Sequence, residues 1–325
     1  MLKRIELHNH SIESDGRMSV PELCSWLLSQ GVTAFSLTDH NTVSGFPLLR
    51  HFHEAHPVFE YLTGYELTSW YGHILCQNVK GYIPWEDLDR ENGDLFLERV
   101  HAQGGLAGIA HPASFPHPVS NGLFFEFEIR DWSSVDFIEI VNHAHPAFPD
   151  NAKGILFWEE RLLQGFSRGV HPAQVSGMDL HAPVDMSSSY RTWMELDGPV
   201  ETAPLSEQFS YAIKKNRTIV SNGPVLLQER KGDSLSLQID LKTDERARTL
   251  PEDTPFLLFL RSPAASFSRR IQRNASLSLS ACGIREDEPV ILKLYPETAS
   301  FAKSPCGHSL PEHILPSCIR LSLPE

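Results

Sequence analysis

The sequence predicts an α/β fold over residues 1–224 and a small antiparallel β domain over residues 225–325. In the first part, short apolar runs alternate with helical patterns, which is typical of parallel strands joined by crossover helices. After Pro224 the chain instead carries short strand-like runs separated by proline, glycine and charged residues. Histidine follows the same division, because fourteen of the sixteen histidines lie at or before His181.

The individual elements follow from local patterns. A first strand is expected over residues 5–8, and a helix over residues 19–30, where Ser19 can cap the helix and Pro21 and Glu22 fall in its first turn. Further strands of the first part are expected at residues 34–38, 105–110, 135–141 and 174–178, with helical segments between them such as residues 155–164. Strands of the second part are expected at residues 234–241, 256–260, 275–280, 290–295 and 319–323.

Composition narrows the class of protein. A content of 41% hydrophobic and 21% charged residues is that of a folded domain, and no apolar run is long enough to span a membrane. Residues 1–7 lack the apolar core of a signal peptide, and the five cysteines are scattered, so we expect reduced thiols in a cytoplasmic protein. The net charge of -13 makes nucleic acid an unlikely partner except as a small nucleotide substrate. The pattern predicts no oligomeric state.

The strongest local signal is His8-Asn9-His10, followed by Asp15. On a strand, residues i and i+2 point the same way, so both imidazoles can reach one metal ion. Asp15 lies in a loop that can fold back over the end of the strand. A His-x-His pair alone is a weak motif, and it indicates a metal site only if further ligand candidates occur later in the chain.

The same arrangement recurs along the chain, where each of several polar groups comes directly after a predicted strand. These groups are His40 after residues 34–38, Glu66 with His73 after residues 62–65, His111 after residues 108–110, and Asp179 with His181 after residues 175–178. The carboxyl ends of parallel strands meet at one edge of a barrel or sheet, so we expect these side chains to converge. Any one of them alone would be interpreted as an ordinary core or loop residue.

Together these residues resemble the PHP (polymerase and histidinol phosphatase) superfamily of metal-dependent hydrolases. The motifs are His8-Asn9-His10 with Asp15, Thr38-Asp39-His40, Gly64-Tyr65-Glu66 with Gly72-His73, Ala110-His111-Pro112, and Asp179-Leu180-His181. A narrower likeness to the carbaryl-hydrolase-like branch rests on Glu139-Ile140-Val141-Asn142, Phe157-Trp158-Glu159, and Asn216-Arg217-Thr218 with Ser221-Asn222-Gly223-Pro224. One departure is Gly177-Met178 before Asp179, where relatives commonly carry Ser.

The resemblance implies a distorted seven-stranded (β/α) barrel with a site for two or three divalent ions. One ion would be held by His8, His10, Glu66 and Asp179, a second by Glu66, His73 and His111, and a third by Asp15, His40 and His181. Mixed imidazole and carboxylate ligands suit Zn, Mn or Fe, and the sequence does not choose among them.

A charge count points to phosphate as the substrate. Six neutral imidazoles and three carboxylates set a charge of -3 against +6 from three divalent ions, and a bridging hydroxide leaves about +2. Such a site suits a dianionic phosphate ester, cleaved by a metal-activated bridging hydroxide that Asp179 helps to position. His143 or His145 would protonate the leaving group, although a loop histidine commonly has no such role. No Gly-x-Ser-x-Gly nucleophile motif is present.

Two alternatives remain open. The same metals could serve a carboxylic or carbamic ester hydrolase, whose neutral substrate would need an apolar pocket; Trp70, Tyr71, Trp132 and Phe148 are candidates for lining it. A non-catalytic metal-binding scaffold is the second alternative.

Some histidines are excluded from the site. His51, His53 and His56 lie on one predicted helix, where positions i and i+2 diverge, and His117 and His171 follow no predicted strand. Asp39 is expected to support the ligands without binding metal.

Overall fold

The computed structural model describes residues 1–115, 122–143, 149–243, 250–297, 301–303, 309–311 and 317–324. Its α-helices are α1 (Val20–Ser29), α2 (Phe46–Ala55), α3 (Gly93–Ala102), α4 (Pro149–Gly165) and α5 (Leu205–Lys214). Short 3-10 turns lie at Trp132–Ser134, Phe166–Arg168, Gly198–Thr202 and Ser280–Cys282. None of the described helices is long and apolar enough to cross a membrane.

One sheet of six strands carries the N-terminal half of the chain. Its order is β2 (Ala34–Leu37), β3 (Glu60–Ser69), β4 (Gly72–Gln77), β5 (Leu106–Ile109), β6 (Phe137–Asn142) and β7 (Ala173–Gly177). The pairs β2–β3, β5–β6 and β6–β7 are parallel, whereas β4 runs antiparallel to both of its neighbours. The sheet is therefore mixed rather than a uniform β/α repeat.

The predicted seven-stranded (β/α) barrel is wrong, and two local features explain why. Only residues 70 and 71 separate β3 from β4, and a connection this short can join only antiparallel strands. The first strand, β1 (Leu2–Ile5), pairs antiparallel with β8 (Arg191–Glu195) in a different sheet. Past β1 the chain pairs with residues near both edges of the six-stranded sheet through isolated bridges, Glu6 to Phe35 and Asn9 to Leu180, and through a backbone hydrogen bond from Thr38 to Asn9.

The second sheet joins strands from both ends of the chain. Its seven strands run β1, β8, β9 (Thr218–Ser221), β18 (Cys318–Ser322), β15 (Val290–Pro296), β12 (Phe256–Arg261) and β13 (Ser266–Ile271), all antiparallel. Smaller sheets are formed by β10 (Val225–Lys231), β11 (Ser234–Asp240) and β14 (Asn274–Ser278), and by β16 (Phe301–Lys303) and β17 (Ser309–Pro311).

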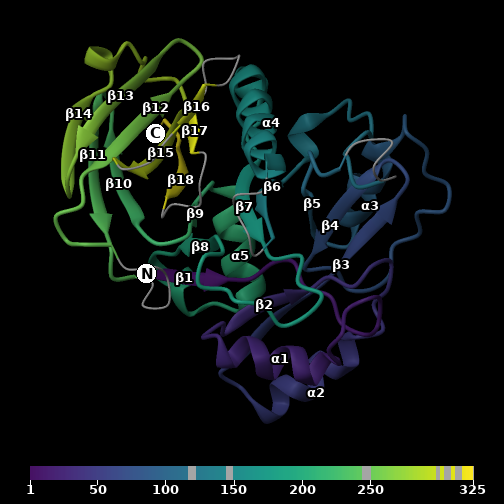
Figure 1. Cartoon of the computed structure of the whole chain (residues 1–325). Helices are drawn as coiled ribbons and strands as arrows, with labels where there is room; N and C mark the ends of the chain where they lie inside the picture. Colours follow the sequence, from purple (N-terminus) through teal and green to yellow (C-terminus); the bar gives the residue numbers. More distant parts are fainter. Residues whose placement is uncertain are drawn as a thin grey trace.

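The expected antiparallel strands after residue 224 are thus present, and β10, β11 and β14 form a sheet of their own, but β12, β13, β15 and β18 belong to the sheet that also contains β1, β8 and β9. β18 pairs with β9, so one sheet continues across the boundary predicted between residues 224 and 225. In Figure 1 the helix α4 stands between these C-terminal strands and the strands β3 to β5. The division into domains at residue 224 remains a prediction.

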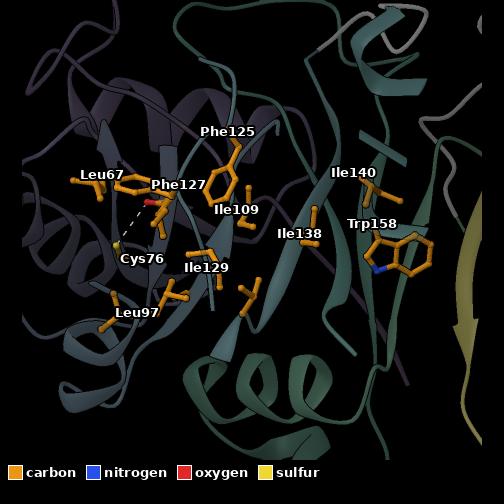
Figure 2. Packing of buried hydrophobic residues seen from close by; sticks show 14 of the residues in the cluster. Leu67, Cys76, Leu97, Ile109, Phe125, Phe127, Ile129, Ile138, Ile140 and Trp158 are labelled. Atoms are coloured by element: carbon orange, nitrogen blue, oxygen red, sulfur yellow. Dashed lines mark hydrogen bonds between the residues drawn. The ribbon is translucent and has the colours of Figure 1, made fainter. Parts of the chain in front are cut away.

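The helices form where the sequence supplies caps and apolar faces. α1 begins after a capping box in which Ser19 and Glu22 bond each other's backbone, and it buries Val20, Leu23, Cys24 and Leu27 at helical spacing. α4 packs on β6 and places Trp158 in the largest core cluster. Figure 2 shows Trp158 beside Ile140, with Phe125, Phe127 and Ile109 farther along the same cluster. This packing fixes the strand ends that carry the polar groups.

Candidate metal centre

The predicted His-x-His pair lies where the chain leaves β1 and passes between the edges of the six-stranded sheet. Asn9 anchors the segment: its backbone N–H donates to Thr38 Oγ1 at 2.9 Å and its amide donates to the Ser36 carbonyl at 3.0 Å. His8 and His10, on either side of Asn9, are fully buried and share a group with Glu66 and Asp179. The alternation expected of an extended chain therefore brings both imidazoles to one place.

The first group of donor atoms is compact. His8 Nε2 lies 3.1 Å from Glu66 Oε2 and 3.4 Å from Asp179 Oδ1. His10 Nε2 lies 3.0 Å from the same Asp179 oxygen and 3.5 Å from Glu66 Oε2. Glu66 comes from β3, the second strand of the sheet, and Asp179 follows β7 at the far edge, so the group joins segments from opposite sides of the sheet.

Glu66 also faces the second predicted set of ligands. Its Oε1 lies 2.9 Å from His73 Nδ1 on β4 and 3.1 Å from His111 Nε2, after β5. Its Oε2 lies 3.0 Å from His40 Nδ1, and His40, Glu66 and His73 form a compact group that the sequence did not predict. Glu66 is thus the carboxylate shared by several imidazoles.

The third group contains Asp15, His40 and His181, as the sequence predicts, together with His10. His181 Nε2 lies 3.1 Å from Asp15 Oδ1, and the His10 ring stacks on that of His40 and on that of His181, each with centroids 4.2 Å apart. Asp15 lies in this group because its loop folds back toward His181. The loop is held there by the N–H of Arg17, which donates to the His181 carbonyl at 2.7 Å. A Cβ at Gly16 would lie 2.3 Å from the His10 carbonyl oxygen, so this close turn requires glycine.

The electrostatics of the cluster follow from burial and from the mutual approach of opposite charges. Burial disfavours a charged His8, yet Glu66, Glu139 and Asp179 raise its pKa well above the usual value. Glu66 likewise raises the pKa of His111 to about 9 against the effect of burial. Conversely, the imidazoles lower the pKa values of Glu66 and Asp179 although burial would raise them. Both carboxylates are therefore held as anions.

Many of the nitrogen and oxygen atoms that could bind a metal ion make no hydrogen bond within the described part of the chain. They are His8 Nε2, both ring nitrogens of His10, Glu66 Oε2, His111 Nδ1 and Asp179 Oδ1, and all are buried. Unsatisfied buried polar atoms are uncommon in folded proteins, and a cluster of them calls for an explanation. Imidazole nitrogens and carboxylate oxygens that converge on one space fit divalent metal ions of the zinc, manganese or iron type.

Backbone strain gathers at the same place. Five of the described non-glycine residues with positive φ adjoin the cluster: Asn41 (50°), His111 (25°), Phe115 (30°), His143 (82°) and Asp179 (48°). Left-handed backbone is unfavourable for residues other than glycine, and it concentrates at functional sites. The surrounding packing therefore holds His111 and Asp179 in conformations that they would not adopt freely.

Asp39 does not join any donor group, in line with the supporting role expected for it. Its carboxylate accepts from the Ser11 backbone N–H at 2.6 Å, the Ser11 hydroxyl at 2.8 Å and the Ser14 hydroxyl at 2.8 Å. Asp39 thus holds the loop that delivers Asp15.

His143 lies beside the cluster. It lines a cavity of about 180 Å³ together with His111, Asp179, Phe115, Leu123 and Asn151, and its backbone N–H donates to the Gly177 carbonyl at 3.1 Å. The other candidate proton donor, His145, lies outside the described residues, as does Phe148. Of the aromatic residues considered for an apolar pocket, Trp70 is largely exposed at the β3–β4 turn, and Trp132 stacks under Arg161.

The excluded histidines stay apart from the cluster. On α2, His51 is exposed and His53 bonds the backbone carbonyl of Phe59, while His56, just after the helix, bonds the backbone carbonyl of Phe52. His171 meets the amide of Asn216, and His117 lies outside the described residues.

Two residues that contact the ligand candidates were not predicted. Thr68 Oγ1 lies 2.5 Å from His40 Nδ1, and Glu139 bonds His8 and the backbone of His111. Glu139 had one signal in the sequence, since it is a carboxylate inside the apolar run of residues 135–141.

Comparison with known proteins supports the fold. The chain resembles a two-domain protein from Bacteroides vulgatus that contains a predicted PHP-like metal-dependent phosphoesterase, at 14% identity and a TM-score of 0.56, over 96% of this chain and 95% of that one. This likeness covers both halves of the chain. At 14% identity it establishes a shared fold and nothing about chemistry.

Two further solved structures are more distant. An amidohydrolase from Chromobacterium violaceum with bound sulfate and no metal matches at 17% identity and a TM-score of 0.39, over 55% of this chain and 88% of that one. A protein from Bifidobacterium adolescentis assigned as a metal-dependent phosphoesterase matches at 14% identity and a TM-score of 0.39, over 65% and 96%. Neither likeness is close enough to support an argument.

No family model matches the sequence, and no curated protein does. The neighbour with the shared fold contains a predicted PHP-like domain, and the narrower likeness to the carbaryl-hydrolase-like branch finds no support in these comparisons.

Proposed function

We propose that this chain is a metal-dependent hydrolase that cleaves phosphate esters at the strand-end cluster, using two or three divalent ions. The observation that carries the proposal is the convergence of nine imidazole and carboxylate side chains, five of which have buried nitrogen or oxygen atoms that make no hydrogen bond within the described residues. The fold shared with a protein that contains a PHP-like phosphoesterase supports it.

The charge of the site favours an anionic substrate once metals are bound. The three carboxylates are Asp15, Glu66 and Asp179, and no lysine or arginine among the described residues pairs with any of them. Bound divalent ions would reverse the sign of the site, activate a water molecule and neutralise charge on a phosphoryl group.

The chain's own residues would hold and orient these parts. His8, His10, Glu66 and Asp179 would bind one ion, Glu66 with His73 and His111 a second, and Asp15, His40 and His181 a third. Glu66 faces two of these sets and would fix their separation. His143 lines the adjoining cavity, where it would donate a proton to the leaving oxygen.

A carboxylic or carbamic ester hydrolase is the second candidate. Phe115 and Leu123 on the cavity wall favour it, because they offer apolar surface for a neutral leaving group beside His111.

One panel separates these functions. Protein loaded with Zn²⁺ or Mn²⁺ is assayed against nucleotide, sugar and aryl phosphates, and against the matching aryl acetates and carbamates. The proposal expects phosphate esters to be cleaved with the higher kcat/KM. Cleavage of acetates or carbamates alone would establish the second candidate, and a metal-loaded protein inactive on the whole panel would favour a scaffold without catalysis.

A further inference from the structure

We propose that Glu139 is a positioning residue that sets the tautomer of His8 and keeps His8 Nε2 available to a metal ion. This inference rests on the proposed function, because it concerns the same metal cluster.

Both carboxylate oxygens of Glu139 accept hydrogen bonds from residues of the cluster. On β6, and fully buried, it accepts from His8 Nδ1 through Oε1 at 3.0 Å. Its Oε2 accepts from the backbone N–H of His111 at 2.9 Å and from the Asn142 amide at 3.0 Å. One carboxylate thus holds His8 and the backbone of His111, which belong to two different predicted ligand sets.

The neighbouring strand makes room for this contact. A Cβ at Gly177 would lie 2.3 Å from Glu139 Oε1 and 2.5 Å from His8 Cβ. Only glycine at this position of β7 lets the carboxylate and the imidazole meet.

The donor pattern determines which ring nitrogen of His8 carries the proton. A backbone N–H can only donate, so Oε2 must accept from His111. With Oε1 accepting in the same way, the proton that His8 keeps when a metal ion takes its other nitrogen lies on Nδ1. The lone pair then lies on Nε2, the nitrogen that points toward Glu66 and Asp179. Partners of this kind fix the tautomer and orientation of histidine ligands.

Glu139→Gln tests the inference with little change of shape. The amide oxygen must face the His111 N–H, which leaves the amide NH₂ facing His8 Nδ1. His8 would then accept at Nδ1 and carry its proton on Nε2, where it cannot bind metal. The expected result is a loss of metal affinity of about 10–100-fold for the ion held by His8.

Asp136→Asn is the matched control. Asp136 lies just before β6 and makes the same kind of contacts away from the cluster, with His101 Nε2 at 2.7 Å and the Ala107 N–H at 2.8 Å. This variant should bind metal as the wild type does.

The readout is metal affinity by chelator competition, with bound Zn²⁺ or Mn²⁺ counted by elemental analysis, so activity is not needed. Wild-type affinity in Glu139→Gln, or equal losses in both variants, would overturn the role of Glu139 while leaving the proposed function intact. A wild-type protein that binds no metal would overturn the proposed function, and this inference with it.

Two further variants make the test specific. In a His8→Ala background, Glu139→Gln should reduce metal affinity much less than it does in the wild-type background, because the two side chains act as one unit. An equal reduction in both backgrounds would show that Glu139 does not act through His8. If Glu139→Gln does not fold, Glu139→Asp keeps the charge but is too short to reach both His8 and His111. Full metal affinity in a folded Glu139→Asp protein would contradict the proposal.

Discussion

Two buried clusters of charge in this molecule are built in opposite ways. The first joins α4 to the seven-stranded sheet, where Glu159 accepts from Lys293 Nζ at 2.6 Å through Oε1 and from Arg261 at 2.7 Å through Oε2. Burial would raise the pKa of Glu159, but Lys293 and Arg261 outweigh it and lower the pKa. Both carboxylate oxygens have cationic partners, so the protein itself completes this cluster.

The metal-site cluster is not completed by the protein. Glu66 and Asp179 face only imidazoles among the described residues, and Glu66 Oε2, Asp179 Oδ1 and His8 Nε2 make no hydrogen bond there. Burial alone therefore does not distinguish a structural ion cluster from a binding site. What distinguishes them is whether the chain supplies the countercharge.

The largest expected effect is on the metal-site cluster, which is the open cluster because the protein does not complete it. Asp179→Asn keeps the shape of the side chain but removes an anionic ligand, so hydrolysis should fall by more than about 100-fold and metal affinity should fall with it. His51→Ala is the control, because His51 is 87% exposed and belongs to no donor group. Equal activity of wild type and Asp179→Asn at saturating metal would remove Asp179 from the mechanism.

In the closed cluster, which is that of Glu159, Lys293 and Arg261, a substitution should change the free energy of unfolding and leave metal binding unchanged. Lys293→Met removes one of the two cationic partners described for the buried Glu159, and removing one partner of a buried ion pair costs about 3–5 kcal/mol of unfolding free energy. Lys231→Met is the matched control, because Lys231 pairs with Glu229 in an exposed position. Urea denaturation and metal counting test both; loss of metal from a folded Lys293→Met protein would contradict the separation of the two clusters.

A smaller effect appears in the pH dependence of stability. The pKa of Glu159 is lowered from 4.5 in the folded state, so its contribution is fully present above pH 4.5 and is lost as the pH falls through the folded pKa. In unfolding experiments with chelator present, the stability gap between wild type and Glu159→Gln should narrow on acidification below that value. A gap that stays constant into acid would mean that the ion pairs do not cause it.

The sequence allowed the ligand candidates to be predicted because their signal is local. His8 and His10 share a face at spacing i and i+2, and Asp179 with His181 repeats the pattern after another strand. Strand ends of one sheet meet at one edge, which is why residues far apart in sequence could be expected to converge.

The remaining features depend on tertiary structure. The turn at Trp70 and Tyr71 reverses β4, and the pairing of β1 with β8 removes the first strand from the expected barrel. Neither change alters the apolar pattern of the strand concerned, so the pattern could not reveal it. Glu159 and Lys293 are 134 residues apart, and nothing near either residue indicates the other.

The most direct test of the central claim is the metal content of the full-length wild-type protein, purified without chelator. Elemental analysis should find two to three divalent transition-metal ions per chain, and Asp179→Asn should retain fewer. Less than one ion per chain, in folded protein supplied with Zn²⁺, Mn²⁺ and Fe²⁺, would contradict the account of the open cluster as a metal centre.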